Sequence, residues 1–136
     1  MAGLPLPVPD EQTAPFWDYC RKGELRMQRC VQCGVFRHPP RAMCRHCGSM
    51  EAEWAAVSGR GAVYSYTVTH QPIHPALVDL VPHVAVLVEL DEGVRLTSNV
   101  VDCAPDEIEI GMAVEVVFEQ INQEITLPKF RRVSME

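Results

Sequence analysis

Long apolar runs are missing from this 136-residue chain, in which no stretch approaches the roughly twenty residues that a membrane-spanning helix requires. The start of the chain, where prolines alternate with small apolar residues over 4–9, does not resemble a secretory signal peptide. A content of 47% hydrophobic and 22% charged residues is typical of a soluble folded protein. We therefore expect a cytoplasmic protein that makes no membrane contact.

The motifs of several enzyme classes are absent as well. Gly59-Arg60-Gly61 lacks the later glycine and the strand-to-helix setting of a dinucleotide-binding fingerprint, and the chain has no serine-hydrolase nucleophile elbow. Cys20 and Cys103 have no base close by in the sequence, and an isolated cysteine is usually a small buried hydrophobic residue. We therefore predict no catalytic residues on this chain.

Two matching Cys-x-x-Cys-Gly knuckles, formed by Cys30, Cys33, Cys44 and Cys47 with their glycines, are the strongest pattern present. The glycine after each second cysteine can take the positive φ that turns backbone N–H groups toward sulfur. Ten residues separate the two knuckles, which indicates a short zinc ribbon or a rubredoxin-like site. Four thiolates leave no open position, so we predict a structural zinc ion, with iron as the alternative; a disulfide pair would need an oxidising compartment.

The nearby histidines are not needed as ligands. Four cysteines complete a tetrahedral shell, and His46 lies inside a knuckle, facing away from the metal, so we expect His38 and His46 at the surface. His70 and His74 have the spacing of a helical metal pair, but the prolines among them exclude a regular helix there. We do not predict any of the four as metal ligands.

Charge is unevenly distributed along the chain. The net charge is −6, yet residues 21–45 contain only one acidic side chain, Glu24, against seven basic ones: Arg21, Lys22, Arg26, Arg29, Arg37, Arg41 and Arg45. These cations either offset the negative charge of a four-thiolate zinc centre, or receive phosphates or an acidic partner. The acidic remainder argues against broad binding to duplex nucleic acid.

The order of patterns predicts three segments: a proline-rich arm over 1–12, a helix with a zinc ribbon over 13–50, and a β domain over 51–136. The helix begins near Thr13, which can cap it, and ends at Gly23; an alternating strand over 24–29 then leads into the first knuckle. Phe16, Trp17 and Tyr19 lie on this short helix. We expect one face of the helix to pack on the chain's own core and the opposite face to contact a partner.

From residue 53 onward the sequence is rich in β-branched and aromatic residues. It predicts strands over 54–57, 62–69, 83–90, 94–101, 113–119 and 125–133, with a hairpin turn at 91–93 and a helical turn over 105–111. The last five strands predict a small closed barrel of the OB type, so the fold class is mainly β. The long connection over 70–83 separates the first two barrel strands, and loops of that length are uncommon unless they are functional.

These motifs, read together, resemble domain-of-unknown-function family thirty-five over roughly residues 13–133. The resemblance is carried by the four cysteines and by the segments Pro15-Phe16-Trp17, Gly23-Glu24-Leu25, 59–66, 111–116 and 127–131. It implies a helical N-terminus, a rubredoxin-like zinc ribbon that uses all four cysteines, and a C-terminal OB barrel. It also implies acyl-CoA metabolism, because members of this family accompany thiolases and the thiolase-fold retro-aldolases of steroid side-chain breakdown, or are fused to hydratase-like domains.

Our main hypothesis is therefore a non-catalytic accessory subunit of a thiolase-fold acyl-CoA lyase or thiolase. Arg37 and Arg41 are the candidates for contact with CoA phosphates. The candidates for contact with the partner are Phe16, Trp17, Tyr19, His70 and His74. Two alternatives stay open: a single-stranded nucleic-acid-binding OB module, which would need a basic groove with stacking aromatics, and a rubredoxin-like electron carrier.

Overall fold

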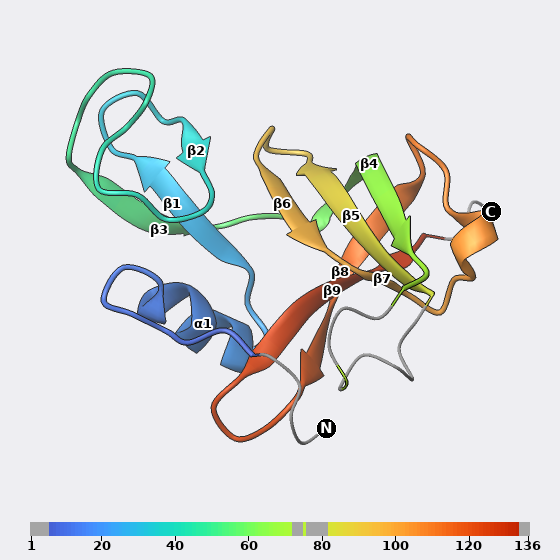
Figure 1. Ribbon diagram of the computed structural model, residues 1–136. Helices are drawn as coiled ribbons and strands as arrows, with labels where there is room; N and C mark the ends of the chain where they lie inside the picture. The colour runs from blue at the N-terminus through green and yellow to red at the C-terminus, as the bar shows by residue number, and fades with distance from the viewer. Residues whose placement is uncertain (1–5, 72–74, 76–81, 134–136) are drawn as a thin grey trace.

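The computed structural model describes residues 6–71, 75 and 82–133 and arranges them as a small ribbon sheet, one α-helix and a β-barrel (Figure 1). The ribbon sheet and the barrel lie side by side, and the helix sits below the ribbon against the barrel strand β9. Across the described residues, no helix has the length and apolar character needed to cross a lipid bilayer.

The helix α1 (Ala14–Arg21) begins after a turn that Asp10 organises. The Asp10 carboxylate accepts hydrogen bonds from the backbone N–H groups of Gln12 (2.9 Å) and Thr13 (2.8 Å), whereas the Thr13 side chain makes no capping bond to the helix. Thr13 is therefore the N-cap residue, as expected, but it makes no capping hydrogen bond, and Asp10 fixes the turn that precedes the helix. The chain reverses at Gly23, whose φ of +76° suits glycine.

The ribbon sheet has the strand order β2–β1–β3, formed by β1 (Arg26–Cys30), β2 (Phe36–Arg37) and β3 (Ala52–Ala56). Both outer strands run antiparallel to β1, and the pairing with β3 extends from Arg26↔Ala56 to Cys30↔Ala52. The strand expected at the start of the β domain thus pairs with the ribbon. Its position on β1 places both ends of the metal-binding segment next to each other.

The second sheet has the order β6–β5–β4–β8–β9–β7 and follows the predicted OB topology. Its strands are β4 (Arg60–Thr69), β5 (His83–Leu90), β6 (Arg95–Ser98), β7 (Val100–Val101), β8 (Ala113–Gln120) and β9 (Thr126–Arg132), with the 3₁₀ turn η2 (Pro105–Glu107) before β8. The one strand expected over 94–101 is divided between β6, which pairs with β5, and β7, which pairs in parallel with β9.

Asn99 separates β6 from β7 and closes the barrel. Its side-chain amide donates a hydrogen bond to the Val84 carbonyl on β5 (2.6 Å), while its own carbonyl accepts one from the Phe130 N–H on β9 (2.9 Å). Asn99 therefore links β5 with β9, the strands next to the edge strands β6 and β7, and so helps to close the sheet into a barrel.

One continuous core fills the barrel and extends under the helix. Alternate residues of β5 are buried, and Val63, Val88, Val114 and Phe130 have at most 1% of their surface exposed. Phe16 and Cys20 of α1 and Met27 of β1 belong to the same cluster. The helix and the first ribbon strand are therefore anchored to the barrel by hydrophobic burial.

Candidate metal centre and adjoining clefts

The four knuckle cysteines converge as the sequence predicts, with all four sulfur atoms within 4.8 Å of one another. The Sγ–Sγ distance is 3.5 Å between Cys30 and Cys47 and 3.6 Å between Cys33 and Cys44. A tetrahedral zinc ion with Zn–S bonds of about 2.3 Å requires sulfur atoms about 3.8 Å apart. The donor set and its spacing therefore fit one zinc ion, and among the residues that the structure describes no fifth donor joins the four cysteines.

The two knuckles are built alike. In each, the glycine N–H donates a hydrogen bond of 2.9 Å to the carbonyl of the first cysteine, from Gly34 to Cys30 and from Gly48 to Cys44. Both glycines have a positive φ, 77° and 81°, as the spacing predicts. The repeated geometry indicates that the sequence Cys-x-x-Cys-Gly determines the local turn without help from the rest of the fold.

Backbone N–H groups in the knuckles stabilise thiolates, but four thiolates this close together repel one another. The Cys33 N–H lowers the pKa of Cys30 to about 6, and the Cys47 N–H lowers the pKa of Cys44. At Cys33 the Val35 N–H acts in the same direction, yet burial and the neighbouring sulfurs outweigh it and raise the pKa to about 12. A bound divalent cation would remove this conflict, because it stabilises all four thiolates together.

The two ribbon histidines differ from each other. His46 is exposed, as expected. His38 is mostly buried, so its predicted surface position is wrong: its ring packs on Phe16 with centroids 5.0 Å apart, and burial lowers its pKa to about 4. The contact arises because α1, which the sequence does not place relative to the ribbon, covers this side of the loop.

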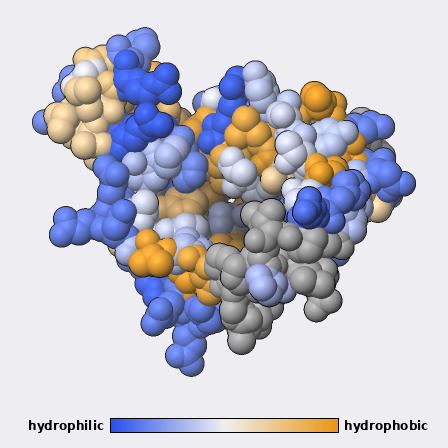
Figure 2. Space-filling model, viewed as in Figure 1, coloured by the Kyte–Doolittle hydropathy of each residue, from blue (hydrophilic) through white to orange (hydrophobic). Residues whose placement is uncertain are grey.

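A basic cleft of about 470 Å³ separates the ribbon from the tip of the β5–β6 hairpin. The lining includes Phe36, Arg37, His38, Arg41, Cys44, Arg45, His46, Gly93, Val94 and Arg95. Figure 2 shows strongly hydrophilic groups on the side of the ribbon that faces the barrel, beside more apolar groups at its outer end. The predicted pair Arg37 and Arg41 is therefore joined by two further arginines.

Arg37 and Arg41 have different roles in this cleft. The Arg37 Nε donates to Gln28 Oε1 (2.8 Å), and its Nη2 donates to the Arg41 carbonyl (2.8 Å). Gln28 Oε1 also accepts a hydrogen bond from the Arg41 N–H (2.8 Å). Arg37 thus fixes the loop that carries Arg41, while the Arg41 residue itself is exposed.

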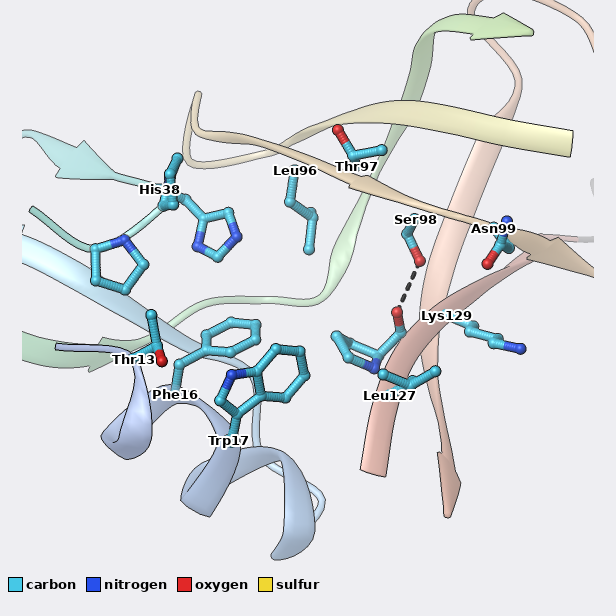
Figure 3. Close-up of a pocket in the computed structure, with 13 residues that line it drawn as sticks. Thr13, Phe16, Trp17, His38, Leu96, Thr97, Ser98, Asn99, Leu127 and Lys129 are labelled. Atoms are coloured by element: carbon cyan, nitrogen blue, oxygen red, sulfur yellow. Dashed lines mark hydrogen bonds between the residues drawn. The ribbon is translucent and has the colours of Figure 1, made fainter. Parts of the chain in front are cut away.

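A smaller apolar cleft of about 260 Å³ lies where α1, the loop 38–40 and the barrel meet (Figure 3). Phe16 and Trp17 form its helix side, and Leu96 and Leu127 form its barrel side. The Ser98 hydroxyl at its rim donates to the Pro128 carbonyl (2.7 Å) and is therefore already satisfied. The cleft is suited to an apolar group.

The five residues predicted at a partner interface lie in different environments. Phe16 is only 4% exposed and belongs to the chain's own core, so the accessible aromatic surface of the helix is limited to the half-buried Trp17 and Tyr19. Tyr19 packs near Trp54 of β3 and lies under the Arg26 guanidinium, 5.0 Å from the ring centroid. His70 is exposed at the end of β4, and His74 lies outside the described residues.

The residues that the sequence analysis did not single out come mainly from the barrel. Arg95 and Leu96 of β6, and Leu127 of β9, line the two clefts although they are distant from the cysteines in the sequence. The predicted hairpin turn at 91–93 is present, but its approach to the ribbon depends on how the two sheets pack. Arg45 was visible as part of the basic segment, and only its place in the cleft was missed.

Comparison with known proteins gives a consistent result. Residues 17–51 match the domain family described as "ChsH2, rubredoxin-like zinc ribbon domain", and residues 54–119 match "ChsH2, C-terminal OB-fold domain". The chain is 38% identical over 115 residues to a "DUF35 domain-containing scaffold protein" of Methanothermobacter thermautotrophicus, a match that covers 83% of this chain and 86% of the relative.

Two further matches are to a hydratase subunit and to the solved structure of an aldolase. A "Probable enoyl-CoA hydratase alpha subunit" of Thermomonospora curvata is 44% identical over 127 residues, which cover 93% of this chain but only 39% of the relative. The chain thus spans about two-fifths of that subunit. A solved structure described as "Ltp2-ChsH2(DUF35) aldolase" matches with a TM-score of 0.84 and 43% identity, covering 93% of this chain and 98% of the other.

Proposed function

This chain belongs to the DUF35 family of proteins that join a ChsH2-type zinc ribbon to an OB-fold, and from this premise we propose that it is the non-catalytic subunit of a thiolase-fold acyl-CoA lyase. It would stabilise the partner and help to shape the site at which the partner cleaves an acyl-CoA by a retro-aldol or thiolytic reaction. A substrate from steroid side-chain degradation suits the family resemblance.

The observation that carries this proposal is the match to the aldolase structure. The matched chain there is covered almost completely, so the likeness includes the ribbon, the helix and the barrel together. The hydratase subunit, in contrast, is much longer than the matched region. A partner with hydratase activity is therefore the second candidate within the same class of acyl-CoA enzymes.

We propose that zinc occupies the four-cysteine site and acts structurally. Cys30, Cys33, Cys44 and Cys47 would be its ligands, and their sulfur spacing suits a closed tetrahedral shell. Such a shell offers no position for water or substrate, so the metal would hold the ribbon in shape while the reaction takes place on the partner. Visible absorption from an iron–thiolate centre in the purified protein would contradict zinc.

We propose that the partner contacts the exposed side of α1 and the end of β4. Trp17 borders the apolar cleft, Tyr19 lies on another side of the helix near Trp54 of β3, and His70 is exposed. An aromatic side chain next to an apolar cleft is a common centre of binding energy at protein interfaces. Arg37 and Arg41 would support contact with CoA phosphates, Arg37 mainly by fixing the Arg41 loop.

The experiment is co-expression with a thiolase-fold aldolase subunit of the Ltp2 type, followed by size-exclusion chromatography and an acyl-CoA cleavage assay with and without this chain. We expect co-elution and turnover that depends on the chain. Trp17→Ala should weaken the affinity for the partner at least tenfold and so reduce co-elution, since an interface tryptophan can contribute about 2 kcal/mol or more of binding free energy. Ile110→Ala, an exposed apolar residue of the barrel that lines neither cleft, is the matched control. Separate elution, or turnover that ignores the chain, would contradict the proposal.

The alternative of single-stranded nucleic-acid binding rests on Tyr64 and Tyr66, which are 47% and 37% exposed on β4. Stacking aromatics of this kind are used by OB-folds. The Tyr64 ring, however, is already covered by the Arg95 guanidinium, 3.8 Å from its centroid. Salt-sensitive binding of single-stranded oligonucleotides would favour this alternative.

A further inference from the structure

We infer that the basic cleft binds a small molecule carrying at least two phosphate groups, held by Arg41 and Arg45 of the ribbon and by Arg95 of the barrel. The inference deepens the proposed function and rests on it only for the ligand's identity, since the cleft would hold the phosphates of the partner's acyl-CoA substrate. Binding itself can be tested on this chain alone.

Two polar side-chain atoms in the wall of this cleft have no hydrogen-bond partner. Within residues 6–71, 75 and 82–133, the buried side-chain nitrogen and oxygen atoms that lack a hydrogen-bond partner are Arg37 Nη1 and His38 Nδ1. Both residues line the cleft. Arg37 Nη1 is itself enclosed, so a ligand in the cleft would not bond to it directly. With Nε and Nη2 bonded to Gln28 and to the Arg41 carbonyl, Arg37 acts by fixing the loop that carries Arg41.

The ribbon arginines of the cleft also lack the carboxylate partners that most other arginines have. In the described part of the chain, Arg41 and Arg45 make no ion pair, whereas Arg21, Arg131 and Arg132 each bind an aspartate or glutamate. Exposed guanidiniums that are not neutralised by carboxylates are suited to phosphate, which they can bind through two parallel hydrogen bonds.

Arg95 completes the site from the other side. It stacks on the Tyr64 ring and binds Glu89 (2.9 Å), so its position is fixed although its charge is shared. A ligand that contacts Arg95 and Arg45 together must span from the barrel to the ribbon. A cleft of about 470 Å³ between two modules has the size and location common for small-molecule sites.

The competing explanation is that the arginines only offset the charge of the metal centre. Cys44 lies at the edge of the cleft, so the thiolates are close enough for this role. That explanation gives Arg95 no function, because Arg95 is on the barrel and already paired with Glu89. The two explanations therefore differ in what Arg95 should do.

The test is titration calorimetry of the metal-loaded chain at fixed ionic strength, with adenosine 3′,5′-bisphosphate, pyrophosphate and phosphate as probes. We expect the bisphosphate and pyrophosphate to bind, and single phosphate to bind more weakly. Arg45→Gln and Arg95→Gln should each weaken binding about tenfold, the effect of losing one charge-assisted hydrogen bond. Arg21→Gln on α1 is the matched control, because Arg21 is outside the cleft, and it should leave binding unchanged.

Several outcomes would overturn the inference. These are no binding of either two-phosphate probe at millimolar concentration, equal weakening by Arg21→Gln, or tighter binding of a single-stranded oligonucleotide than of the bisphosphate. Metal loss in Arg45→Gln with unchanged probe binding would assign that arginine to the thiolates instead. If the probes do not bind but the chain still co-elutes with the partner, only the phosphate site is rejected. If the probes bind but the chain does not co-elute, the proposed partner is rejected.

Discussion

The ribbon and the barrel bury apolar surface to very different extents. In the barrel, Val88 and Phe130 are completely buried, whereas the ribbon exposes Val31 and Val35 by 53% and 42% and Met43 and Met50 by 54% and 66%. The knuckles therefore have almost no hydrophobic core of their own. A metal ion bound by the four cysteines would take over that role in the ribbon, while the barrel is held by ordinary packing. One chain thus contains two modules that should respond to different perturbations.

Metal removal should separate the two modules most strongly. Structural zinc binding in small domains is worth on the order of 10 kcal/mol, so a chelator or Cys44→Ser should unfold the knuckles while β5 stays protected. Hydrogen exchange followed by mass spectrometry measures both regions in one sample. Cys103→Ser, a cysteine outside the cluster, should have no such effect. Simultaneous loss of protection in β5 would show that the barrel also depends on the metal.

A large core truncation should have the reverse effect. Phe130→Ala removes a fully buried ring and should lower the free energy of unfolding by about 4 kcal/mol, while the bound metal per chain stays the same. Denaturant unfolding and metal analysis measure these two quantities. Phe118→Ala, at a half-buried position, should cost clearly less. Loss of metal from Phe130→Ala at neutral pH would contradict the independence of the modules.

Mild acid should weaken the contact between the modules. Burial lowers the pKa of His38 from 6.5 to about 4, so between these values the unfolded chain binds the proton more readily than the folded chain. Stability should thus fall as the pH drops from 6.5 toward 4, by about 2 kcal/mol at pH 5, and change little above 7.

The measurement is the difference in unfolding free energy between pH 7 and pH 5. His38→Asn should lack this part of the pH dependence, and the exposed control His46→Asn should keep it. Acid also protonates thiolates, but that contribution is common to all three proteins. Equal pH dependence in wild type and His38→Asn would rule out His38 as its source.

A knuckle glycine should give the smallest of these effects. Gly34 has a φ of +77°, and a Cβ there would meet only Arg29 Nε and Nη2 at 3.9 Å, an ordinary van der Waals distance. Gly34→Ala should therefore cost only backbone strain of about 1–2 kcal/mol. Metal affinity should fall about fivefold to thirtyfold in a competition assay with a chromophoric chelator. Gly93→Ala, with a φ of +89° in the barrel hairpin, should lower stability similarly and leave metal affinity unchanged.

The sequence predicted features that depend on local chemistry. The knuckle turns, the ligand cysteines and the alternating barrel strands were all predictable, because turn geometry and strand periodicity are determined by neighbouring residues. It did not place His38 under Phe16, and it did not divide the strand over 94–101 at Asn99. Both depend on contacts between segments far apart in the sequence.

By itself, then, the sequence determined a four-thiolate site, a mainly β fold and a basic segment beside the metal. Only the tertiary structure decided which sheet β3 joins, that Phe16 is buried in the chain's own core, and that Arg95 faces the ribbon arginines across a cleft. The physical reason is that local turns and strands form from short-range preferences, whereas clefts exist only where separately formed modules pack against each other.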